Sequence, residues 1–163
     1  PSVALEVTCD LTLNLAQGFR KGEFDIVLLK RERSAGNGGV RVWREPLVWV
    51  AGQHDYVHGS GPLPLVVSPE PCVYRKRAIE SLDRARRRWR IAYTCGSLAG
   101  SIAAVRAGLG ISVLPKEMVP NGLHAIDGDP LPDLKDTEIA LLSGPSLRAP
   151  VAKLRDHIVR CLG

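Results

Sequence analysis

The sequence predicts an α/β fold, in which short apolar strands alternate with amphipathic helices. Residues 90–94 form a short apolar run, and Leu98, Ile102 and Val105 follow at the spacing of one helix face. Residues 111–114 form the next apolar run. This order of strand, helix and strand is typical of a βαβ unit with a right-handed crossover. The same alternation recurs along the chain, for which we expect about six strands and four helices.

The loop inside this unit is the first candidate site. Ser97 is placed to cap the helix, and Gly108 suits the left-handed position that ends it. Residues 94–97 therefore follow the carboxyl end of a strand and precede the amino end of a helix. Open α/β sheets bind ligands at such places, and the free N–H groups of a helix start attract anions. We expect a binding site here.

The remaining elements follow from the same patterns of apolar runs and turn residues. Lys21 and Gly22 suit the end of the first helix, and a run rich in proline and aspartate at residues 127–136 indicates a connection. The glycine-rich residues 34–39 indicate a loop. Residues 40–44 and 46–51 are expected to be extended. The other expected strands are residues 3–7, 24–29, 63–67, 123–126 and 137–142, and the other helices are 13–19, 73–87 and 149–162, with one helical turn at 116–119.

Composition narrows the class of protein. In 163 residues, 45% are hydrophobic, which is enough for a core, and no apolar run is long enough to span a bilayer. The four cysteines form no C-x-x-C pair, so we expect reduced thiols in a cytoplasmic protein. His54 and His58 lie in a polar loop without an evident third ligand, and we expect no metal and no cofactor.

Charge is concentrated in one segment. The net charge is +5, whereas residues 75–90 alone carry eight basic and two acidic side chains. Such a basic helix is most often a solvated face, and no aromatic residues interleave it for base stacking. We therefore expect this segment to be a solvated surface rather than a direct contact with nucleic acid.

Motifs of catalysis are absent from the sequence. No Gly-x-Gly-x-x-Gly follows a strand, no P-loop occurs, and no serine lies in a nucleophile elbow. Asp10 and Asp25 suit turns and salt bridges. We expect no enzymatic activity.

Six motifs occur in order along the chain: GEFDIVL at 22–28, REPLVWV at 44–50, LPL at 63–65, CVYR at 72–75, WRIAY at 89–93 and AGLGISVLP at 107–115. Together these motifs resemble the effector-binding domain of LysR-type transcriptional regulators over essentially the whole chain. The resemblance implies two Rossmann-like lobes joined by two crossover strands, as in type 2 periplasmic-binding proteins. It also implies that the first strand and helix of lobe I, and the N-terminal winged helix-turn-helix, are missing.

The resemblance also implies domain limits and a site. Lobe I would comprise residues 1–50 and 137–163, and lobe II residues 51–136, with a small, anionic effector in the cleft between them. Three helix starts, small hydroxyls and one cation suit a carboxylate. The implied effector-binding residues are Thr12, Lys30, Cys72, Val73, Thr94, Gly96 and Ser97.

Simpler interpretations stand beside each of these residues. Thr12 and Ser97 are as readily helix caps, and Lys30 is more often a surface charge. Cys72 and Cys95 suit redox-sensing thiols, because helix starts lower thiol pKa values, but inert buried cysteines are more common. The three tryptophans, Trp43, Trp49 and Trp89, are expected to fill the core or an interface.

The function implied is ligand sensing in a bacterial, cytoplasmic transcription regulator. Such a domain forms homodimers or homotetramers, with the helix near residues 12–20 against the helix near 73–87, and reaches DNA only through the missing N-terminal domain. The alternative is a solute-binding protein of a transport system, against which the reduced cysteines weigh.

Overall fold

The computed structural model describes residues 4–31, 38–52, 61–126 and 131–162. Within them, four α-helices, one 3-10 turn and seven strands form a mixed α/β structure, as the sequence predicts. The chain divides into two compact units, unit 1 (residues 1–45 and 136–163) and unit 2 (residues 46–135). The chain therefore passes twice between the units, within strand β2 and at the start of strand β7. The lobe limits expected from the sequence lie nearby and stay a prediction.

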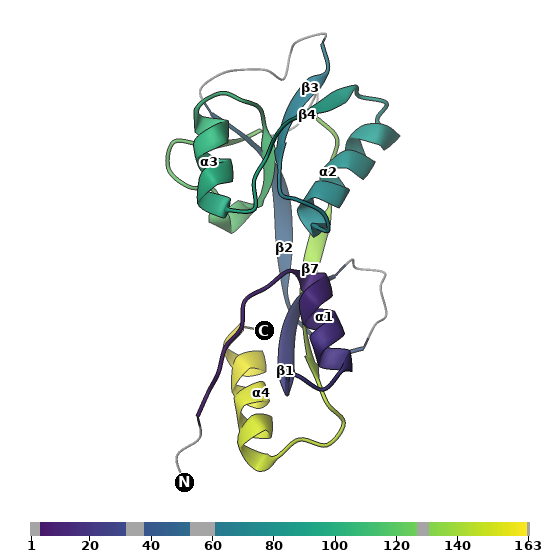
Figure 1. Cartoon of the computed structure of the whole chain (residues 1–163), viewed down its shortest axis with the longest axis vertical. Coiled ribbons are helices and arrows are strands. Elements are labelled where there is room, and N and C mark those ends of the chain that lie inside the picture. Colours follow the sequence, from purple (N-terminus) through teal and green to yellow (C-terminus); the bar gives the residue numbers. More distant parts are fainter. Residues whose placement is uncertain (1–3, 32–37, 53–60, 127–130, 163) are drawn as a thin grey trace. The chain divides into compact units, whose positions relative to one another are not determined.

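Unit 1 is built on an antiparallel strand pair. Strand β1 (Ile26–Arg31) pairs with β7 (Asp136–Ser143) along its whole length, with Leu28 opposite Leu141. Helix α1 (Thr12–Arg20) precedes β1, and α4 (Ala149–Leu162) follows β7 (Figure 1). Gly22, at a φ of 78°, ends α1 in the left-handed conformation that favours glycine. Both helices and both strands were expected from the sequence, to within two residues at each end.

The strand expected at residues 3–7 is wrong over the described residues 4–7. These residues form no strand, and Leu5 and Val7 remain 66% and 73% exposed. A β-branched run has strand propensity, but a strand exists only when a neighbour accepts its backbone hydrogen bonds. Strand β1, the nearest in sequence, pairs with β7 instead.

A buried polar pair lies at the point where the chain returns to unit 1. The Thr137 side chain is fully buried and donates a hydrogen bond to the Glu45 carboxylate at 3.1 Å. Glu45 itself is only 8% exposed. Nearby, the buried Glu138 carboxylate lies 3.5 Å from the Arg31 guanidinium. Polar side chains are tolerated at this depth because hydrogen-bond and salt-bridge partners replace their hydration.

Unit 2 contains two sets of strands. Strand β2 (Val40–Ala51) pairs antiparallel with β5 (Ser112–Pro115) and with β6 (His124–Ile126). Strand β3 (Leu63–Val67) pairs in parallel with β4 (Trp89–Thr94). A parallel bridge from Leu65 to Ile111 lies on the other edge of β3. The expected βαβ unit consists of β4, the helix that follows it and β5. Its two strands are not neighbours, because β3 lies between β4 and the start of β5.

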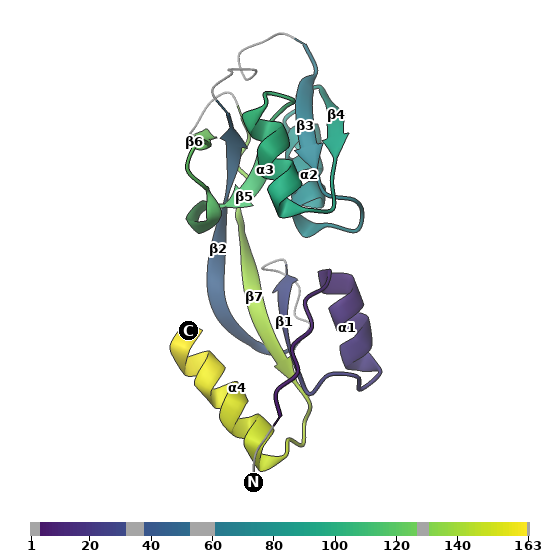
Figure 2. The same cartoon turned by 60° about the vertical axis from the view of Figure 1, so that its left-hand side comes forward.

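Two helices cover opposite sides of β3. Helix α2 (Val73–Arg84) connects β3 to β4, and α3 (Leu98–Arg106) connects β4 to β5 (Figure 2). The 3-10 turn Lys116–Met118 follows β5, as expected. Leu63, Leu65 and Val67 pack with α2, whereas Val66 packs with α3. This alternation explains why β3 reads as a continuous apolar run: both of its faces are buried.

Several sequence expectations need correction or lie outside the described residues. Helix α2 ends at Arg84, three residues before the expected 87, because Arg86 adopts a left-handed φ of 53°. Trp49 is a core residue, and its indole N–H donates to the Pro132 carbonyl at 2.8 Å. Most of the expected loop 34–39, the His54 and His58 pair, and residues 127–130 of the connection lie outside the described residues. Among the described helices, none is long and apolar enough to cross a lipid bilayer.

Replacing Gly110 by alanine should destabilise unit 2. A Cβ at this position would overlap the Pro64 carbonyl group, whose carbon would be only 2.8 Å away. Moving β3 to relieve this overlap should cost about 1–3 kcal/mol of unfolding free energy. Gly61 has open space around it, so Gly61→Ala is the matched control and should change stability by less than about 0.5 kcal/mol. Equal urea midpoints for the two variants would refute this packing.

Replacing Thr137 by valine should also destabilise the fold. The change keeps the shape of the side chain but removes a hydrogen bond to a buried carboxylate, which should cost about 1–3 kcal/mol in urea unfolding. Thr8 is exposed, so Thr8→Val serves as the control and should be nearly neutral. If Thr137→Val behaved like Thr8→Val, the hydroxyl would not stabilise Glu45.

Candidate functional site

The candidate site of unit 2 lies where β3 and β4 end. The two strands run in parallel, with Val67 opposite Thr94, and the Cys95 N–H donates to the Val67 carbonyl at 3.0 Å. The loops that lead to α2 and α3 therefore both leave the sheet where β3 and β4 have their carboxyl ends. A Cβ on Gly96 would lie 4.0 Å from the Pro69 ring. The loops that lead into the two helices therefore approach each other at Pro69 and Gly96.

The start of α3 is shaped by three small residues around Cys95. Ser97 is the N-cap, and its hydroxyl accepts a hydrogen bond from the Gly100 N–H at 3.4 Å. The Ser97 N–H in turn donates to the Cys95 sulfur at 3.5 Å. A Cβ on Gly100 would lie only 2.6 Å from this sulfur. The glycine thus allows the half-buried thiol to pack against the first turn, while Gly96 and Ser97 remain exposed.

The start of α2 has a different cap. Cys72 is the N-cap in an extended conformation, and its side chain forms no capping hydrogen bond. Val73 is the first helical residue, and both residues are half-buried. An uncapped first turn leaves backbone N–H groups for another acceptor, and the helix dipole favours a negative one.

Arg75 holds the loop before α2 and was not predicted as a site residue. Its guanidinium donates to the Ser68 carbonyl at 3.2 Å and lies 3.3 Å from the Glu70 carboxylate. The loop between β3 and α2 is thereby fixed against the helix that follows it. In the sequence, the only signal was an acidic and a basic residue five positions apart, which is not specific.

In unit 1, Thr12 and Lys30 lie at the same end of the unit. Thr12 is the first residue of α1, and Lys30 lies near the end of β1, which runs back along the helix. Both are half-buried. Thr12 does not cap the helix: Leu11 is the N-cap, and no side chain forms a capping hydrogen bond there. The capping interpretation is thus right for Ser97 and wrong for Thr12.

The cysteines and the aspartates Asp10 and Asp25 are the other residues that the sequence singles out. All four cysteines are free, and the described residues contain no group of three potential metal ligands. Asp10 accepts hydrogen bonds from Leu11 and Asn14, and Asp25 lies 3.4 Å from Arg148. Both aspartates therefore have the local structural roles expected from the sequence.

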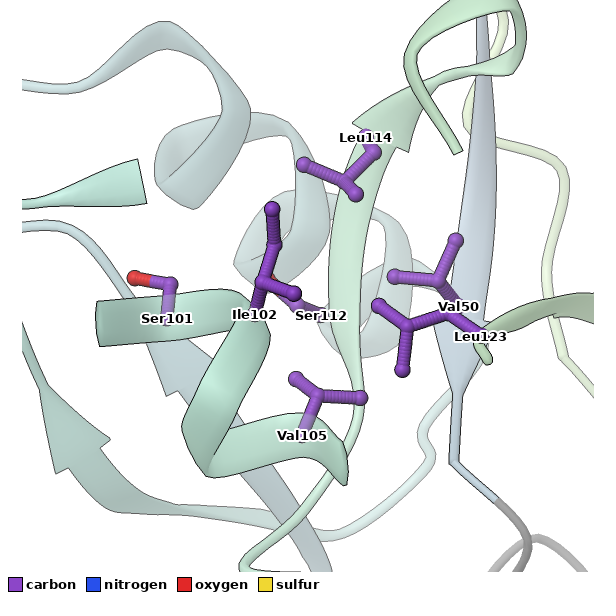
Figure 3. Close-up of a pocket in the computed structure, with 7 residues that line it drawn as sticks. All are labelled: Val50, Ser101, Ile102, Val105, Ser112, Leu114 and Leu123. Carbon is purple, nitrogen blue, oxygen red and sulfur yellow. The ribbon is translucent and has the colours of Figure 1, made fainter. Parts of the chain in front are cut away.

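A separate, small cavity lies behind α3 (Figure 3). It has a volume of about 10 Å³, which is room for about one water molecule. It is too small for an organic effector, and none of the predicted site residues borders it. Its lining residues are Val50, Ser101, Ile102, Val105, Ser112, Leu114 and Leu123.

Solved structures share this fold at low sequence identity. The regulatory domain of CcmR from Synechocystis PCC6803, in complex with 2-PG, matches with a TM-score of 0.75 at 17% identity, covering 93% of this chain and 80% of that one. The apo regulatory domain of HypT from Salmonella typhimurium matches with a TM-score of 0.77 at 16% identity, covering 96% and 81%. The effector-binding domain of QuiR in complex with shikimate matches with a TM-score of 0.71 at 11% identity, covering 94% and 78%. These likenesses confirm the predicted fold, that of type 2 periplasmic-binding proteins.

Curated relatives are regulators. The HTH-type transcriptional regulator DgdR of Burkholderia cepacia is 33% identical over 142 residues, which are 86% of this chain and 48% of DgdR. The HTH-type transcriptional regulator PecT of Dickeya dadantii (strain 3937) is 29% identical over 147 residues, covering 89% and 46%. The chain thus spans about half the length of these relatives. A model described as the LysR substrate binding domain matches residues 1–161, and the chain belongs to this family.

Proposed function

We propose that this chain is the part of a LysR-type transcriptional regulator that senses a small organic anion, most simply a carboxylate. The sensing would take place in the cytoplasm and without catalysis. The names of the relatives favour a regulator over a solute-binding protein of a transport system. In the whole protein, DNA would be bound by a winged helix-turn-helix domain.

The observation that carries this proposal is that the loops leading into α2 and α3 leave the parallel strands β3 and β4 at one edge and approach each other at Pro69 and Gly96. The uncapped start of α2 and the loop at Gly96 and Ser97 supply N–H groups and a hydroxyl, without a carboxylate among the proposed residues. Such a set complements an anion. We propose that Cys72, Val73, Thr94, Gly96 and Ser97 contact the effector, together with Thr12 and Lys30 from unit 1.

Transmission would depend on two arrangements of the units. An effector changes their populations only if it binds one arrangement more tightly than the other. Contacts made to the effector by residues of both units at once would provide this difference. The readout in the whole protein would be a changed spacing of its DNA-binding domains.

Ser97→Arg and Thr12→Arg should each abolish stabilisation by the effector. The probes are aromatic and aliphatic carboxylates, screened by thermal shift on the unchanged protein. A carboxylate at 100 times its Kd should stabilise the fold by about 2.7 kcal/mol, and a bulky side chain at either position should remove this shift. The control is Ala149→Arg, which places the same side chain at the exposed start of α4. If both site variants kept the full shift, the effector would bind elsewhere.

We further propose that the chain forms a homodimer through α1 of one copy and α2 of the other. Leu13 is 56% exposed on α1, so its side chain is accessible to a partner chain. Leu13→Asp should therefore shift sedimentation from dimer towards monomer. Leu162 on α4 is 45% exposed, and Leu162→Asp should leave the dimer intact. Equal sedimentation of both variants would refute the proposed interface.

A further inference from the structure

Four exposed arginines surround the end of α2 and the beginning of β4. We call them the arginine corner: Arg84, Arg86, Arg88 and Arg90. Arg84 is the last residue of α2, Arg86 and Arg88 lie in the connection, and Arg90 lies in β4. Figure 1 shows this connection as a short link between α2 and β4. Together with the half-buried Arg87, five positive charges thus lie within seven consecutive residues.

The nearby acidic side chains are already engaged. The Glu80 carboxylate lies 3.7 Å from the Lys76 ammonium group, one helical turn away. The Asp83 carboxylate accepts a hydrogen bond from the Trp89 indole N–H at 2.7 Å. Within the described part of the chain, none of the four guanidinium groups of the corner forms an ion pair. Their charge is therefore available to a partner.

Arg86 occupies a position where glycine is favoured. Helices α1 and α3 each end with a glycine at this position, Gly22 at a φ of 78° and Gly108 at 79°. Helix α2 ends the same way, but with Arg86 at 53°. A left-handed conformation is unfavourable for a residue with a Cβ. An arginine in this left-handed position, at a cost in stability, points to a use for its charge.

The spacing of the corner suits a row of phosphates. Arg88 directly precedes β4 and Arg90 lies in it; in extended backbone, side chains two positions apart leave the same face about 7 Å apart. Guanidinium groups bind phosphates through two parallel hydrogen bonds. Trp89, between them, is half-buried and bonded to Asp83, so it offers no platform for stacking bases. Spaced arginines without a stacking aromatic side chain fit the phosphate backbone of a duplex better than single-stranded bases.

We propose that the arginine corner binds the phosphate backbone of duplex DNA without reading its sequence. Charge complementarity supports this partner, and the relatives of the chain are HTH-type regulators, which place DNA close by. This second DNA contact goes beyond effector sensing and does not depend on it. The sequence alone favoured a solvated face; the exposed side chains, which form no ion pair within the described residues, and the left-handed Arg86 favour a binding surface.

The test measures binding of the 163-residue chain to a fluorescent duplex of arbitrary sequence. At low salt, fluorescence anisotropy should show binding whose logarithmic salt dependence has a slope of about −3 to −4, as expected for four neutralised phosphates. The quadruple variant, with Arg84, Arg86, Arg88 and Arg90 changed to glutamine, should lose at least about tenfold in affinity and most of this slope.

The control removes the same charge elsewhere. Lys21, Lys116, Lys153 and Arg160 are exposed, and their change to glutamine lowers the net charge by the same four units. This variant should keep most of the affinity. Equal losses in the two quadruple variants would overturn the proposal in favour of a general charge effect. Polyglutamate binding as tight as duplex binding, at equal charge concentration, would overturn it in favour of an acidic protein partner.

A single substitution separates binding from stability. Arg86→Gly relieves the left-handed conformation, so the thermal unfolding midpoint should rise while the affinity for the duplex falls and the salt slope weakens by about one. An unchanged affinity in this variant would show that Arg86 is not part of a binding surface. Because no effector enters these measurements, their outcome is independent of the carboxylate screen.

Discussion

The pairing of strand β3 on both of its edges is the constraint on which the rest of unit 2 depends. All five residues of β3 are buried. One edge pairs with β4, and on the other the Val66 N–H donates to the Ile111 carbonyl at 2.8 Å. The Ser112 hydroxyl donates to the Val66 carbonyl at the same distance. Because buried backbone groups must be paired, β3 cannot shift without breaking contacts on both sides.

This constraint also determines where the candidate site lies. Since β3 and β4 are parallel, the loops after Val67 and Thr94 emerge at one edge, and each loop begins a helix. Arg75 fixes the first loop, and the packing of Cys95 against Gly100 fixes the second. Two helix starts are thereby held in place before any ligand arrives, which lowers the entropic cost of binding one. The proposed sensor is, in this half, preorganised.

The sequence predicted most of the fold because most signals in this chain are local. Residues 63–67 form an unbroken apolar run, and α3 has a capping serine before it and Gly108 after it. Residues 4–7 failed because strand propensity does not supply a pairing partner. The end of α2 was missed because an arginine, not a glycine, takes the left-handed position. Arg75 was missed because its role depends on a loop that only the fold brings near.

The central claim is that the starts of α2 and α3 together capture an anion. Measuring the backbone amide chemical shifts by NMR tests this claim most directly. On titration with a stabilising carboxylate, the amide signals of Val73, Gly96 and Ser97 should move together along one binding curve. The amides of α4, for example Lys153, should stay unchanged. Saturable shifts confined to other elements, with these three signals unmoved, would contradict the account.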